Sequence, residues 1–90
     1  MTERQATKDP GARVDYDLDW SEYLGADTIA TSSWTVPAGL TLYAQTATTT
    51  VATVWIEGGT AGVDYAITNR VTTAGGRIDE RSILIRVRDR

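Results

Sequence analysis

Short segments in which apolar and polar residues alternate recur along this chain, and turn-forming residues separate them. The clearest is residues 14–20, where three aspartates alternate with Val14, Tyr16, Leu18 and Trp20. A period of two places the apolar side chains on one face of a β-strand and the aspartates on the other. Because no segment shows the longer period of an amphipathic helix, the pattern predicts an all-β domain.

Six segments are predicted to be antiparallel strands: residues 14–20, 27–36, 40–45, 49–57, 63–73 and 77–88. Breaks in apolar parity predict one bulge near Ser32 and Ser33 and another between Glu80 and Ser82. A turn or a single helical turn, ending at Gly25, is expected after the first strand. Two sheets are needed to cover the apolar faces, which predicts an immunoglobulin-like antiparallel β-sandwich.

The start of the fifth predicted strand carries a further sandwich signature. Tyr65 lies two residues before the apolar Ile67 and follows the turn at Gly62. Sandwiches place a tyrosine at such a corner, where its hydroxyl bonds back to the backbone of the turn. We therefore expect Tyr65 to form a tyrosine corner.

The 90 residues are enough for a single domain. Residues 1–12 are polar, contain Pro10 and Gly11, and lack periodicity, so they are predicted to form a flexible, extended N-terminal arm. Residues 13–90 are expected to form the immunoglobulin-like domain.

The chain contains no cysteine and no histidine. This composition excludes disulfides, thiolate nucleophiles, Cys/His zinc sites and Ser-His-Asp triads, so we expect no enzyme activity, cofactor or metal centre. A net charge of −3 argues against nucleic-acid binding. No apolar run approaches the length of a membrane span, and none indicates a signal peptide.

Charge is distributed unevenly along the sequence. Residues 1–27 carry seven acidic and three basic side chains (net −4), whereas residues 70–90 carry six arginines and three acidic side chains (net +3). The acidic first third is therefore expected to pair with the arginines near the C-terminus, either within one chain or between neighbouring copies. The residues proposed for such contacts are Asp15, Asp17, Asp19, Arg77, Arg81 and Arg86.

The three aspartates also have the opening rhythm of a calcium-binding loop. That loop requires Gly at its sixth position and Glu at its twelfth, where this chain has Trp20 and Ala26, so an EF-hand is excluded. On a strand the three carboxylates would project to one side about 6.7 Å apart. Two alternatives stay open for them, a weak cation site and a solvated or salt-bridging face.

The tryptophans are predicted to differ in their environment. Trp20 and Trp34 share parity with apolar neighbours and are expected in the core. Trp55 has the opposite parity to Val54 and Ile56, so it should point outward. Its cover could be the N-terminal arm or another subunit; simple exposure is the third alternative.

Taken together, several motifs resemble a known family over about residues 8–88: the small tailed-phage proteins described as fiber-tail adaptors. The matching pieces are Lys8-Asp9-Pro10, Asp19-Trp20, Asp27-Thr28-Ile29, Trp34, Val54-Trp55-Ile56, Gly58-Gly59, Tyr65, Asn69, Gly76-Arg77 and Asp79-Glu80-Arg81-Ser82. The resemblance implies a non-enzymatic virion component that is made in the cytoplasm of the host bacterium and links tail or connector to tail fibres.

These expectations place function in interfaces with other phage structural proteins, with several copies arranged in a ring. Trp55 is the expected anchor, since Trp and Arg dominate interface energetics. Lys8 and Pro10 join it and the charged residues above as candidate partner contacts. The alternatives are a capsid decoration protein and a carbohydrate-binding module that would use Trp55 and Tyr43 as sugar platforms.

Overall fold

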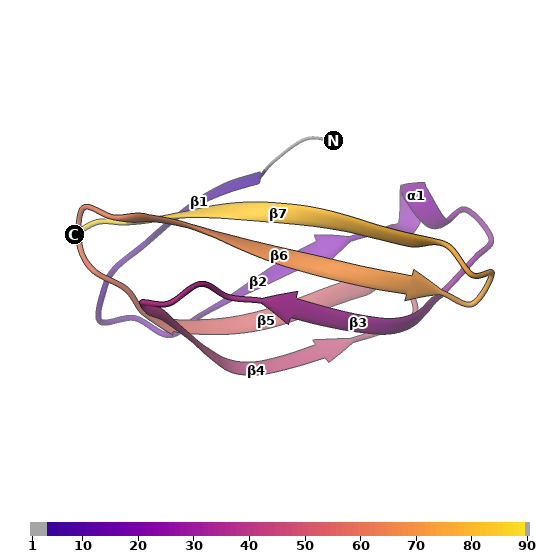
Figure 1. Cartoon of the computed structure of the whole chain (residues 1–90), viewed down its shortest axis with the longest axis horizontal. Helices are drawn as coiled ribbons and strands as arrows, with labels where there is room; N and C mark the ends of the chain where they lie inside the picture. Colours follow the sequence, from indigo (N-terminus) through magenta and orange to yellow (C-terminus); the bar gives the residue numbers. More distant parts are fainter. Residues whose placement is uncertain (1–3, 90) are drawn as a thin grey trace.

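The computed structural model describes residues 4–89, which form seven strands and one short helix (Figure 1). Chain order is β1 (Arg4–Lys8), β2 (Val14–Asp19), α1 (Ser21–Leu24), β3 (Ile29–Thr35), β4 (Leu40–Ala47), β5 (Val51–Gly58), β6 (Asp64–Thr73) and β7 (Ile78–Val87). The four-residue α1 is the only helix within this range, and no helix there is long and apolar enough to cross a membrane. The all-β prediction is confirmed.

The strands lie in two layers (Figure 1). One sheet has the order β1-β7-β6-β3 and the other β2-β5-β4. All neighbouring strands are antiparallel except β1 and β7, which are parallel. The two sheets pack face to face, so the predicted sandwich is confirmed.

The strand order can be compared with that of an immunoglobulin constant-type sandwich, in which strands A, B, E and D face strands C, F and G. Here β2-β5-β4 take the places of B-E-D, and β7-β6-β3 take those of G-F-C. The first strand differs, because β1 lies beside β7 instead of beside β2. The immunoglobulin-like assignment stays a prediction, which this order supports.

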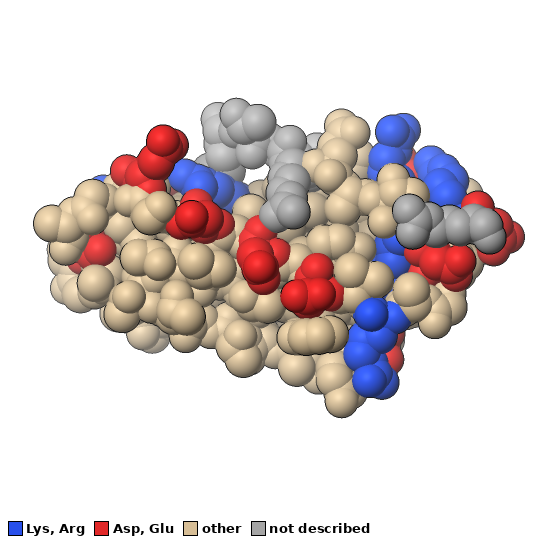
Figure 2. All heavy atoms as spheres, turned by 180° about the vertical axis from the view of Figure 1, so that it is seen from behind, with Lys and Arg blue, Asp and Glu red and all other residues tan. Residues whose placement is uncertain are grey.

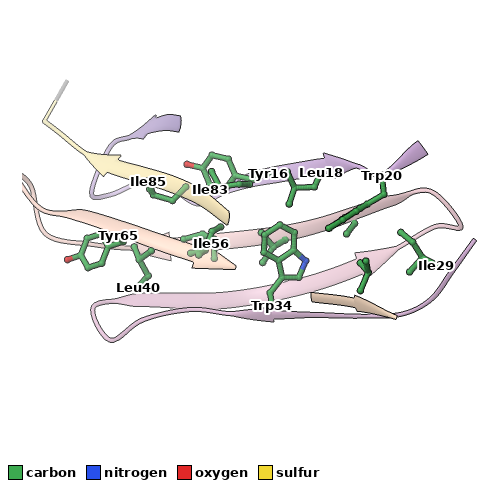
Figure 3. Close-up of a cluster of buried hydrophobic side chains, with 14 of the residues drawn as sticks. Tyr16, Leu18, Trp20, Ile29, Trp34, Leu40, Ile56, Tyr65, Ile83 and Ile85 are labelled. Carbon is green, nitrogen blue, oxygen red and sulfur yellow. The ribbon is translucent and has the colours of Figure 1, made fainter. Parts of the chain in front are cut away.

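The core lies between the sheets and consists of the inward side chains of both (Figure 3). Trp20 and Trp34 are buried there, as predicted, with 0% and 7% of their surface exposed. Aliphatic side chains surround them, among them Val54, Ile56, Ile67, Val71, Ile83, Ile85 and Val87. Burial of this apolar surface is the main force that holds the layers together.

The tyrosine corner is present. The backbone N–H of Thr60 donates a hydrogen bond to the hydroxyl oxygen of Tyr65 at 3.0 Å. The ring of Tyr65 is buried at one end of the core (Figure 3). The turn between β5 and β6 is therefore held to the start of β6.

The sequence-based strand assignment needs four corrections. A seventh strand, β1, lies within the segment predicted to be a free arm; residues 1–3 of that segment lie outside the described range. The register of β3 shifts between Ile29 and Thr31, before the serines where a bulge was expected, and β4 shifts between Leu42 and Ala44. No register shift occurs between β6 and β7. Ile78 is out of phase with the buried residues because its side chain is 56% exposed on an otherwise regular strand.

Candidate functional site

The outer face of the three-stranded sheet carries four of the nine candidate contact residues predicted from the sequence. Alternate residues of β2 place Asp15, Asp17 and Asp19 on this face, because Tyr16 and Leu18 point into the core. Figure 2 shows acidic side chains in a row across the middle of the face, over β2. The adjacent strand β5 contributes Val51, Thr53, Trp55 and Glu57. We refer to these seven residues as the β2-β5 face.

Trp55 lies on this face and points outward, as predicted, with 37% of its surface exposed. Its cross-strand neighbours are Asp15 on β2 and Ala44 on β4. Residues 4–8, which belong to the predicted arm, pair with β7 in the opposite sheet, so they do not cover this side chain. A large aromatic ring that β1 does not cover is the main feature of the surface.

A second aromatic residue lies near Trp55. The guanidinium of Arg13 is 3.7 Å from the ring centroid of Tyr43, and its Nε donates to Glu57 at 2.9 Å. The hydrogen bond to Glu57 is the main cause that raises the pKa of Arg13. Tyr43 itself is 54% exposed. Arg13 was not predicted as a site residue, and the only signal for it in the sequence is the outward parity of its partner Glu57 on β5.

Asp17 and Asp19 of the acidic row accept hydrogen bonds from neighbouring groups. Asp17 accepts a hydrogen bond from the hydroxyl of Thr53 at 2.8 Å. Asp19 accepts one from the backbone N–H of Ser21 at 2.9 Å, and that bond is the main cause that lowers the pKa of Asp19. Within residues 4–89, no group of three or more acidic side chains is placed to hold a metal ion. The row is therefore an open acidic surface.

Arg77 makes its contacts within the chain. Its guanidinium donates to the carbonyl oxygens of Tyr23 and Leu24 at 3.1 and 3.0 Å, and it forms an ion pair with Asp27 at 3.2 Å. It also lies over the ring of Tyr23, 4.6 Å from the centroid. Arg77 thus fastens the end of α1 and the following turn to the β6–β7 hairpin.

The other two predicted arginines also have partners inside the chain. Arg81 lies 4.3 Å over the ring of Trp20 and donates to the carbonyl oxygen of Asp19 at 3.3 Å. Arg86 is 3.7 Å from the carboxylate of Asp64, which also pairs with Arg88 at 2.9 Å. Some of the arginines near the C-terminus are therefore paired with acidic or carbonyl groups of the same chain. This is the alternative in which the uneven charge is balanced within one molecule.

Lys8 is buried, whereas it was expected to be a partner contact on the surface. Only 1% of its area is exposed, and its ammonium donates to the carbonyl oxygens of Gly58 and Asp9 at 2.7 and 2.8 Å. Burial lowers the pKa of Lys8, and the carboxylates of Asp9 and Glu57 oppose that shift. Lys8 fixes the end of β1 to β5 and is removed from the candidate partner contacts. Pro10 is half-buried in the turn that follows.

Comparison with protein families gives one match over almost the whole chain. The model of the family described as podophage GP4 fiber-tail adaptor protein gp77 matches residues 8–86. The chain belongs to this family. A search of curated proteins found no match. The resemblance inferred from the sequence motifs is thus confirmed.

Membership in the podophage fiber-tail adaptor family supports a role as an adaptor in the phage tail, and it implies a location in the tail of the virion and contacts with other tail and fibre proteins. The matched residues run from the last residue of β1 to the penultimate residue of β7, so they include the β2-β5 face, α1 and the β6–β7 hairpin.

The contact between α1 and the hairpin of this family member should make stability depend on pH. The hydroxyl of Thr73, followed by the backbone N–H groups of Thr28 and Gly75 and by Arg77, lowers the pKa of Asp27 from 3.8 to about 2. A carboxyl group whose pKa is lower in the folded state stabilises the fold above the unfolded pKa, and this contribution is lost as pH falls through the folded pKa.

We therefore expect the stability of the wild-type protein to fall between pH 3.8 and about 2 more steeply than that of Asp27→Asn. Urea unfolding midpoints measured at several pH values in this window test the expectation. The variant should be less stable at neutral pH, and the difference should shrink as the solution becomes more acidic. Parallel curves for the two proteins would show that Asp27 does not carry this dependence.

Proposed function

We propose that this chain is a non-enzymatic structural protein of the virion that joins the tail or connector to tail fibres through protein–protein interfaces. It is made in the host bacterium and acts in several copies. Family membership supports the tail over the capsid shell as its location. The observation that carries the interface proposal is Trp55, a 37% exposed tryptophan at the centre of an open sheet face.

The β2-β5 face has the composition of a binding surface. Interfaces are rich in Trp, Tyr and Arg at their centres and polar at their rims. Here Trp55 and Tyr43 supply the aromatic area, and Arg13 supplies a guanidinium beside them. Asp15, Asp17 and Asp19 form an acidic border that favours a partner with a basic patch. We therefore propose Trp55 as the anchor and the aspartates as the charged border.

An adaptor needs a second surface, and we propose the end of the molecule that carries the β6–β7 hairpin. Arg77 is bonded within the chain there, yet 44% of its side-chain surface is exposed. Arg86 is exposed to a similar degree, 48%, but lies near the opposite end of β7 and is a separate candidate contact. Half-exposed guanidinium groups retain donors that a partner carboxylate can accept. Next to Arg77, Ile78 adds exposed apolar surface. Contacts of Arg81 with Trp20 make it a supporting residue of this end.

Substitution of Trp55 tests the proposed anchor. We expect Trp55→Ala to weaken incorporation into tails by about thirtyfold, because truncating a central tryptophan typically costs 2 kcal/mol or more of binding free energy. Stability should change little, since the side chain packs on the outside of the sheet. The assay is complementation of particles that lack the protein, with quantitation of the incorporated variant.

Val63→Ala is the matched control, because Val63 is a similarly exposed apolar side chain, at 40%, in the turn before β6 and outside both proposed surfaces. It should incorporate at a level closer to that of the wild type. If Trp55→Ala folded normally and entered particles as well as the wild type, the β2-β5 face would not be the anchor surface.

A further inference from the structure

One long side of the sandwich consists of two edge strands without any charge. β3 is the edge of the four-stranded sheet and β4 is the edge of the three-stranded sheet, and the two lie next to each other (Figure 1). Both belong to the stretch 28–56, in which there is no Asp, Glu, Lys or Arg. All nine basic and twelve acidic side chains of the protein lie outside this stretch. We call this surface the uncharged side.

Edge strands are normally protected, because their unpaired N–H and C=O groups can pair with any other strand. Charged side chains, prolines and bulges are the usual protection. β3 and β4 have one register shift each, but beyond it Thr31–Thr35 and Ala44–Ala47 run in regular register with their inner neighbours. Within residues 4–89, no strand pairs with the outer edge of either run. These backbone groups are available to another chain.

A shallow groove runs between the two edges. Ser32 lines it from β3, and Gln45, Thr46 and Ala47 line it from β4. These side chains offer hydroxyl, amide and methyl groups but no opposite charge. A charged side chain entering the groove would lose its water without gaining an ion pair, which is unfavourable. The chemistry of the groove therefore selects an uncharged occupant.

A second copy of this chain fits that requirement. Two copies of net charge −3 repel each other, and the uncharged side lets them approach without bringing charged side chains face to face. A contact between two β2 edges would instead bring the row Asp15, Asp17 and Asp19 of both copies together. A twofold axis places an identical strand antiparallel to itself, so an uncharged strand meets only uncharged groups.

We propose that the uncharged side is a self-association surface, on which the β4 edge of one copy pairs antiparallel with the β4 edge of a second copy. The two three-stranded sheets then form one continuous sheet across the axis. The proposal rests on the multi-copy part of the proposed function and not on the identity of the tail or fibre partners. Because it is tested with the isolated protein, it can fail while the adaptor role holds, and the reverse is also true.

Sedimentation and light scattering of the purified protein at increasing concentration test the proposal. The wild type is expected to form a dimer whose population does not fall when the ionic strength is raised, because the contact contains no ion pair to screen. Thr46→Lys should weaken dimerisation by at least about tenfold, since two like charges would then face each other across the axis. Thr60→Lys is the matched control, with the same charge change in an exposed turn near Leu40, at the opposite end of β4 from Thr46, and should dimerise like the wild type.

Backbone hydrogen exchange provides a readout that does not depend on any variant. Amides on the outer edge of Ala44–Ala47 should become more protected as the wild-type concentration increases. A protein that stays monomeric up to roughly 1 mM, the weak end of the binding scale, would overturn the proposal. So would a dimer that Thr46→Lys and Thr60→Lys weaken equally, or protection that appears only when another protein is added.

Discussion

Replacing Asn69 with leucine is expected to lower the free energy of unfolding by about 3 kcal/mol, because it leaves several buried polar groups without partners. Asn69 is fully buried between the sheets. Its Oδ1 accepts a hydrogen bond from Nε1 of Trp20 at 2.9 Å, and its Nδ2 donates to Ser32 Oγ and Ser33 O at 2.9 and 3.0 Å. One amide thus joins the junction of β2 and α1 to β3 and β6.

Leucine has the same number of side-chain heavy atoms and the same branching as asparagine but a larger volume, so the substitution leaves no cavity. The expected loss reports lost hydrogen bonds together with tighter packing. Ser32→Ala is the control, because it removes one acceptor of the same amide and should cost about 1 kcal/mol. Urea unfolding of the two variants and the wild type gives the values. A loss below that of Ser32→Ala would show that the network contributes little to stability.

Gly39→Ala is the second substitution with a large expected effect, a loss of about 3 kcal/mol from backbone strain and overpacking combined. Gly39 has a φ of +103°, which L side chains rarely adopt. A Cβ atom there would lie 2.8 Å from Cε1 and 3.0 Å from the hydroxyl oxygen of Tyr65. Because that hydroxyl accepts from Thr60, the substitution also disturbs the tyrosine corner.

Gly62→Ala separates the two contributions. Gly62 has a similar φ of +89°, but a Cβ atom there would meet nothing within 4 Å. This variant should therefore show only the backbone penalty, about 1 kcal/mol. Thermal or urea unfolding measures both. Equal losses for the two variants would mean that the ring of Tyr65 moves aside at no cost.

The two-layer fold could be predicted because its signals are local. Alternation within single segments sets which side chains face inward, so it predicts Trp20 and Trp34 in the core and Trp55 on the outside, where the structure has them. Tyr65 could be predicted as a corner because the position of a tyrosine after a turn is also a local pattern.

The features that escaped prediction depend on contacts between distant residues. β1 has no apolar alternation, and it forms because β7 offers an edge and because Gly58 accepts from the buried Lys8. The out-of-phase position of Ile78 predicted a bulge that is absent, since the parity of apolar residues alone cannot distinguish an exposed apolar residue from a shift of register. Arg77 and Asp27 are 50 positions apart, and only the packing of α1 against the hairpin brings them together.

If this sandwich works in the tail as an adaptor, its β2-β5 face is buried against a neighbouring protein. An electron-microscopy map of the intact particle decides this question. We expect density for a seven-stranded sandwich at the junction between tail and fibres, with Trp55 enclosed by another chain. Density for the sandwich on the capsid shell, or at the junction with the β2-β5 face open to solvent, would contradict this expectation.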